Sequence, residues 1–185
     1  RQDVKATIRW RPFQLNPWMP GEGMARAEYL RAKFGTSDAG QIYDRIRQVG
    51  AGEAIDFKFE RMRRTPNTLA SHRLIAYAGR FSRQEELVET LFDGYFTDGQ
   101  DIGDLDTLAA AAARAGLDGE AARRYLEGEA DAETVRADDT AARRMGIQGV
   151  PCFILERSYA ISGAQEPEYF LPLFDMVSAS VEAAQ

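Results

Sequence analysis

The sequence predicts an α/β chain in which strands near both ends enclose a long, wholly helical insertion. Val4–Phe13 alternates apolar and polar side chains with the period of two that is typical of a half-buried strand. From Met24 the apolar spacing becomes helical and stays so for about 100 residues. Two short apolar strands follow, Cys152–Leu155 and Tyr159–Ser162. We therefore expect three parts: residues 1–22, an all-helical insertion over residues 23–130, and residues 131–185.

After the first predicted strand, Gln14–Gly23 is rich in proline and glycine and is expected to form a loop. Turn signals then divide the insertion into short helices. The expected helices are Met24–Phe34 before Gly35, Ser37–Val49 before Gly50, Asn67–Ala78 before Gly79, a helix opened by a capping box at Ser82–Glu85, Leu105–Ala115 behind the cap Asp104, and one that begins at Asp118. Ile55–Phe59 reads as a short strand fragment, and a basic cluster follows it: Lys58, Arg61, Arg63 and Arg64.

The C-terminal part is expected to run helix, strand, strand, helix. Thr134–Met145 forms the first of these helices, and Gly146 ends it. Val150-Pro151 then opens a strand, a position at which proline costs no ladder hydrogen bond and at which a cis peptide bond is tolerated. The last helix is expected to open at Glu166-Pro167.

Composition excludes several classes of function. A formal net charge of −6 disfavours nucleic acid as a partner, because neutralising phosphates requires clustered Lys and Arg. No apolar run is long enough to span a bilayer, so no membrane partner is expected. A single cysteine rules out an internal disulfide framework and points to a reducing, cytoplasmic location, which we take to be bacterial. One histidine and one cysteine are too few for a zinc site, so no metal is expected.

Four stretches, spread over nearly the whole chain, carry a resemblance to a known family. They are Trp10–Pro17, Thr65–Leu74, Gly146–Ile154 with its Gly-Val-Pro-Cys-Phe-Ile run, and Ile161–Gln165. Together they resemble the DsbA-like branch of the thioredoxin fold, of FrnE type. Its relatives include 2-hydroxychromene-2-carboxylate isomerases and kappa-class glutathione transferases.

The resemblance implies a thioredoxin-like fold with a helical insertion and a cis-proline at Val150-Pro151. The backbone of Val150 would then bind an extended substrate. His72, Asn67 and Asn16 are the other substrate-binding candidates that the resemblance implies, bordering one cleft with Pro151. Two alternatives stay open on local grounds, because His72 could be satisfied by local hydrogen bonds and helix capping alone could account for Asn67.

The same resemblance implies a glutathione site in which Val150, Ala164 and Gln165 contact the peptide at the start of the last helix. Glutathione is then a substrate or co-substrate, and no other cofactor is required. A plain helix cap at Ala164 and Gln165 is the competing account. The basic cluster after Phe57 is either a solvated face or an anion site.

The chain departs from the family in one respect. Redox members carry Cys-x-x-Cys after their first strand, whereas the lone Cys152 follows the expected cis-proline and reads as a small buried side chain. The first strand and the Cys-x-x-Cys helix are therefore expected upstream of Arg1, because a thioredoxin-like sheet without its central strand leaves backbone groups unpaired.

Three functions follow from these observations. The leading one is a DsbA-like thiol–disulfide oxidoreductase that acts on a disulfide substrate and whose nucleophilic cysteine precedes Arg1. The first alternative is a glutathione-dependent isomerase or transferase of the 2-hydroxychromene-2-carboxylate isomerase type. The second is a non-catalytic thioredoxin-like binding domain. A homodimer is compatible with each.

Overall fold

The structure is a computed structural model that describes residues 6–37 and 39–183, with side chains up to residue 179. Its α-helices are α1 (Arg26–Phe34), α2 (Gly40–Gly52), α3 (Leu69–Gly79), α4 (Gln84–Phe92), α5 (Leu105–Arg114), α6 (Gly119–Glu127), α7 (Ala132–Arg144) and α8 (Leu171–Ala183). Short 3₁₀ turns occupy Phe59–Arg61 and Pro167–Tyr169, and a π-helical turn, Asp93–Thr97, extends α4. Its strands are β1 (Met24–Ala25), β2 (Arg64–Thr65), β3 (Cys152–Leu155) and β4 (Tyr159–Ser162). This mixture confirms the predicted α/β class.

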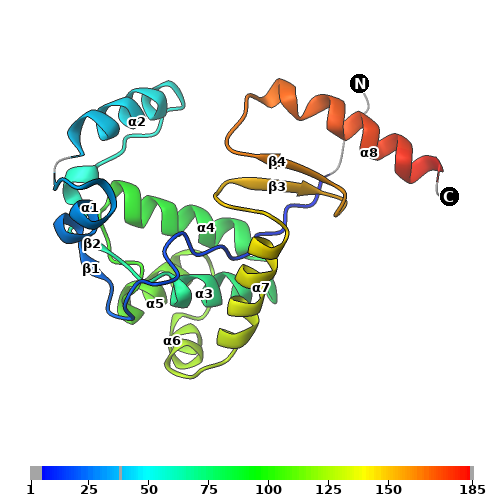
Figure 1. Ribbon diagram of the computed structural model, residues 1–185. Helices are drawn as coiled ribbons and strands as arrows, with labels where there is room; N and C mark the ends of the chain where they lie inside the picture. The colour runs from blue at the N-terminus through cyan, green and yellow to red at the C-terminus, as the bar shows by residue number, and fades with distance from the viewer. Residues whose placement is uncertain (1–5, 38, 184–185) are drawn as a thin grey trace.

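Helices α3 to α6 form a helical body with the largest apolar core of the described chain (Figure 1). Leu74, Leu87 and Leu108 are completely buried in it. Two predicted caps fix where its helices start. The carboxylate of Asp104 accepts a hydrogen bond from the Thr107 N–H (2.8 Å) at the start of α5, and Asp118 does the same at the start of α6. Both predicted caps are therefore confirmed. They could be predicted because capping depends only on residues that are close along the chain.

A buried arginine on α3 ties the helical body to α7. The Arg73 guanidinium donates to four backbone carbonyls at the junction of α6 and α7: Tyr125 (3.1 Å), Leu126 (3.1 Å), Gly128 and Ala130 (2.8 Å). Carbonyls at the end of a helix have no partner within the helix and carry partial negative charge. Arg73 therefore caps the C-terminal end of α6 from a neighbouring helix.

On the left side of Figure 1, α1 lies beside the small antiparallel pair of β1 and β2, and α2 lies above them. Gly35 ends α1 as predicted, in the left-handed conformation that glycine adopts without strain (φ 73°). Helix α2 departs from the prediction, because it begins at Gly40 and continues through Gly50 to Gly52. The ring of Phe57 packs against Gly50, where a Cβ atom would approach it to 2.5 Å. Gly50 thus serves close packing and does not end the helix.

The C-terminal residues form a hairpin of β3 and β4, and α8 lies above it in Figure 1. Its turn contains Glu156 and Arg157, both with positive φ angles. The Phe153 ring packs edge-on against Phe170, with their centroids 4.9 Å apart. No described residue of the hairpin or of α8 is classed as buried. The two predicted strands are confirmed with their predicted bounds.

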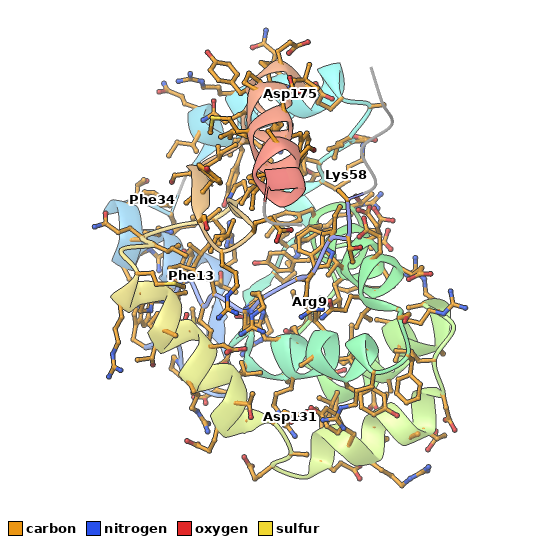
Figure 2. All side chains as sticks on the ribbon, turned by 90° about the vertical axis from the view of Figure 1, so that its right-hand side faces the viewer. Arg9, Phe13, Phe34, Lys58, Asp131 and Asp175 are labelled. Carbon is orange, nitrogen blue, oxygen red and sulfur yellow. The ribbon has the colours of Figure 1, made fainter. Side chains whose placement is uncertain are left out.

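The predicted first strand is not formed. Residues 6–13 have no regular secondary structure, and Val4 and Lys5 lie outside the described residues. A strand requires a neighbouring strand to complete its hydrogen bonds, and none of the described strands pairs with this segment. Instead, it crosses the side of the helical body that faces the hairpin, so that Arg9 and Phe13 lie between the two (Figure 2).

Three smaller predictions are wrong. Ile55–Phe59 contains no strand and leads into the 3₁₀ turn at Phe59. The capping box at Ser82–Glu85 is absent, because the chain reverses tightly between α3 and α4 and the Arg83 N–H bonds back to Ala78 (3.0 Å). This reversal leaves Ser82 with φ +56° and makes Arg83 the N-cap residue. The last α-helix begins at Leu171, since Pro167–Tyr169 forms a 3₁₀ turn first.

Candidate active site

The end of α7 delivers the chain to the proline motif. Gly146, with φ +85°, follows the last turn of α7, and the Ile147 N–H bonds to the Ala142 carbonyl (3.2 Å). This arrangement is a common way to end a helix at glycine and to turn the chain out of it. The Val150–Pro151 peptide bond that follows is cis, and the Val150 side chain is 50% exposed.

One edge of the hairpin has no strand partner at this proline. The Gly163 N–H donates to the Pro151 carbonyl (2.8 Å), and Phe153 pairs with Ile161. In an antiparallel ladder, alternate residues direct their backbone groups to the same neighbour. The backbone groups of Cys152 and Ile154 therefore face away from β4, towards an edge that no described strand covers. By the same alternation, the backbone groups of Val150, two residues before Cys152, face that edge as well.

The extended N-terminal segment pairs with no described strand. Side chains form hydrogen bonds with its backbone groups instead. Gln84 on α4 accepts from the Trp10 N–H (3.2 Å) and donates to the Trp10 carbonyl (3.4 Å). At the other end, the buried Asp139 carboxylate accepts from the Gln14 N–H (2.8 Å), and Arg143 donates to the Gln14 carbonyl. An amide and a carboxylate–guanidinium pair thus satisfy both backbone groups of each residue.

His72, the single histidine, lies beside this segment. Burial lowers its pKa from 6.5 to about 4, while the nearby Asp139 carboxylate and a hydrogen bond to the Phe13 backbone raise it. The imidazole is therefore neutral at pH 7 and contributes a hydrogen bond to the main chain. Among the described residues, no hydrogen bond joins His72 to Val150 or Pro151, so its expected contact with substrate stays a prediction.

Asn16 and Asn67 meet at a single turn of the loop before β1. The Met19 N–H bonds to the Asn16 carbonyl (3.0 Å), and the Asn67 side chain donates to the Met19 carbonyl (2.7 Å). The oxygen of the same amide group accepts from the Leu69 N–H (2.9 Å) at the start of α3. Asn67 thus joins the loop to α3, and Asn16 holds the same loop against Tyr29 (3.3 Å).

Two other predicted sites involve the residues after Gly163 and the basic cluster. Ala164 and Gln165 are exposed, and Gln165 donates to the Ser162 carbonyl (3.2 Å). They precede a 3₁₀ turn, so they do not present the free N–H groups of an α-helix start. The basic cluster is divided among separate partners: Lys58 pairs with Asp56 (2.7 Å), and Arg64 pairs with Asp101 (3.2 Å).

Asp139, Arg143 and Gln84 were missed by the sequence analysis. Asp139 and Arg143 are four residues apart on α7, a spacing at which opposite charges meet on a helix (2.9 Å). That signal was available, but it does not indicate which backbone the pair would hold. Within the described ranges, no group of three or more His, Cys, Asp or Glu side chains could hold a metal ion. Nor does any helix there have the length and apolar character needed to cross a membrane.

Comparisons with known proteins identify the family. The family model of the DSBA-like thioredoxin domain matches residues 1–174. A solved structure of a probable DsbA oxidoreductase from Streptomyces coelicolor matches with a TM-score of 0.79 and 31% sequence identity, over 91% of this chain and 74% of that one. No curated protein sequence matches the chain. The chain belongs to the DSBA-like thioredoxin domain family.

Proposed function

We propose that this protein is a thiol–disulfide oxidoreductase of FrnE type in which the Val150–Pro151 segment binds the backbone of the substrate. The observation that carries the proposal is the uncovered edge of the hairpin. Beside the cis bond, the backbone groups of Cys152 and Ile154 face away from β4, towards an edge that no described strand covers. An extended peptide binds such an edge through main-chain hydrogen bonds, which recognise a peptide without regard to its sequence.

The nucleophile in this proposal is a cysteine of a Cys-x-x-Cys pair on a segment that precedes Arg1. Its thiolate attacks a substrate disulfide, the S–S bond breaks, and one substrate sulfur leaves as a thiolate. The second cysteine of the pair then attacks the mixed disulfide and releases the other substrate sulfur. Two electrons and two protons pass from the pair to the substrate. Glutathione serves as the reductant that restores the pair, and no other cofactor is needed.

The test is reduction of insulin disulfides by the natural full-length protein with glutathione as reductant. Val150→Pro removes the backbone N–H at this position, and we expect turnover to fall by about tenfold, the loss of one or two good hydrogen bonds. Val150→Ala is the matched control and should retain activity, because the proposed contact is made by the backbone. Circular dichroism would establish that both variants are folded.

Cys152→Ala tests whether Cys152, the one cysteine in this sequence, is the nucleophile. Because the proposed nucleophile precedes Arg1, this variant should retain full turnover. Loss of turnover in Cys152→Ala would contradict the proposal, as would a full-length protein without activity. The latter result would support a non-catalytic binding domain. A lone serine in place of the upstream cysteine pair would support the glutathione-dependent isomerase.

A further inference from the structure

Helix α1 begins with a half-buried arginine whose charge meets only neutral oxygen atoms. The Arg26 Nε–H and Nη2–H donate to the Tyr43 hydroxyl, the former at 3.1 Å, and Nη1–H donates to Thr65 Oγ1 (2.9 Å). Its guanidinium also lies over the rings of Tyr29 (5.3 Å) and Tyr43 (5.7 Å). Among the described residues, no carboxylate lies within ion-pair distance of it.

A second cation lies against the same tyrosine. The Lys33 ammonium donates to the Tyr29 hydroxyl (2.8 Å) and lies 5.4 Å from the centre of its ring. Lys33 also has no carboxylate partner in the part of the chain that the structure describes. The Tyr29 side chain is buried, and Trp18 stacks on it with centroids 6.5 Å apart. Two positive charges, Arg26 and Lys33, therefore both contact the ring of Tyr29.

The lack of a carboxylate partner is unusual for Arg26, which is partly removed from water, whereas Lys33 is exposed. Buried charges in proteins are generally paired, because desolvation without a counter-ion is costly. Carboxylates are abundant in this chain, with 29 Asp and Glu against 23 Lys and Arg, yet no described carboxylate forms an ion pair with Arg26 or Lys33. Figure 1 shows α1, α2 and β2 converging here, on the far side of the molecule from the hairpin.

The unused donors define what could bind. A guanidinium has five N–H groups, and the three bonds of Arg26 leave two of them free. Lys33 uses one of its three N–H groups on Tyr29. The hydroxyl of Tyr43, which only accepts in the described contacts, retains its own proton as a further donor. A planar acceptor with one negative charge and two oxygens matches this set of donors.

We propose that Arg26 and Lys33, with the Tyr43 hydroxyl, form a binding site for the carboxylate group of a small organic acid. The site is independent of the proposed redox function, because it uses none of the residues at the cis-proline. Trp18, which is 56% exposed on Tyr29, forms one wall of it.

The experiment uses the indole N–H signals of the protein's two tryptophans in ¹⁵N NMR, during titration with sodium acetate and, separately, inorganic phosphate at constant ionic strength. We expect acetate to shift the Trp18 signal saturably, while the Trp10 signal stays in place as an internal control. Arg26→Gln and Lys33→Gln should each weaken acetate binding by about tenfold, the value of a hydrogen bond to a charged group.

Arg31→Gln is the matched control, since it removes the same charge from an exposed position of the same helix, and it should change affinity less than about twofold. Lys33 is exposed, so its variant tests the site even if Arg26→Gln unfolds α1. The proposal is overturned if acetate causes no saturable shift, if phosphate binds more tightly than acetate, or if Arg31→Gln weakens binding as much as Lys33→Gln.

Discussion

The helical body and the hairpin with α8 differ in how their apolar side chains are used. Leu74, Leu87 and Leu108 in the body are completely buried. In the C-terminal part, Phe153 and Ile154 are 41% and 48% exposed, although both are large apolar side chains. The body is formed by neighbouring helices that supply one another's contacts. The hairpin has a helix on one side and an uncovered strand edge on the other.

The difference indicates where stability and binding reside. Burial of apolar surface provides most of the free energy of folding, so the body should set the stability of the described chain. Exposed apolar side chains beside unpaired backbone groups are available to a partner. The following four predictions test this division, from the largest expected effect to the smallest.

Leu108→Ala should lower the free energy of unfolding by about 3 kcal/mol, because it leaves a cavity in a fully packed core. Leu171→Ala makes the same chemical change on α8, where the side chain is 36% exposed, and should cost less than about 1 kcal/mol. Urea denaturation followed by circular dichroism measures both. Equal losses would show that the two regions do not differ in packing.

Arg73→Met should cost about 2–3 kcal/mol, because several carbonyls at the end of α6 lose a charged donor while remaining buried. Arg80→Met is the control, since Arg80 is exposed and pairs with Asp131 at the surface. Its cost should be below about 1 kcal/mol. A small effect of Arg73→Met in the same urea experiment would mean that water replaces the guanidinium.

Stability should fall as pH decreases from about 6.5 to about 4, because His72 binds a proton more readily in the unfolded chain than in the folded one. The burial that depresses this pKa stabilises the neutral form, so its contribution is complete above pH 6.5 and lost at lower pH. We expect the free energy of unfolding to fall by about 1–2 kcal/mol over this pH range, a value that allows for the solvent that reaches the His72 ring.

His72→Asn keeps a donor for the Phe13 backbone and removes the titration. The difference in unfolding free energy between this variant and the parent should therefore change across pH 4–6.5 and be constant above it. A difference that is independent of pH would show that His72 is as accessible to water as in the unfolded chain.

Ile154→Ser should change the free energy of unfolding by about 0.5 kcal/mol or less, because its side chain is already half in water. Amide hydrogen exchange should be faster in β3 than in α3 in both the variant and the parent, since exchange follows local stability. Slow exchange at Cys152 and Ile154 would indicate that their N–H groups are covered.

The features that the sequence predicted correctly are those in which the determining contacts are close along the chain. Asp104, Asp118 and Gly35 act on residues one turn away, and the hairpin turn joins strands four residues apart. The proline motif was also recognisable, because it is a continuous run of residues.

The features that were missed depend on distant partners. Residues 4–13 have the alternation of a strand, but alternation does not supply the neighbour that a strand requires. The side chains that replace this neighbour, Gln84, Asp139 and Arg143, are 70 to 130 residues away along the chain. The lowered pKa of His72 could not be predicted either, since it depends on burial by side chains and backbone far from it along the chain. The three-part division of the chain stays a prediction.

The separation of the N-terminal segment from its partners matters while the protein is being synthesised. Trp10 leaves the ribosome before Gln84, and Gln14 before Asp139 and Arg143, so this segment has no binding residues for most of translation. The body, whose core residues all lie between Leu74 and Leu126, can fold as it emerges because its contacts are local. Once α7 has been synthesised, Asp139 and Arg143 can bind the backbone of Gln14. A ribosome that stalls before Asp139 would hold a folded body beside a loose N-terminal segment that exposes Trp10 and Phe13, the kind of apolar surface that chaperones bind.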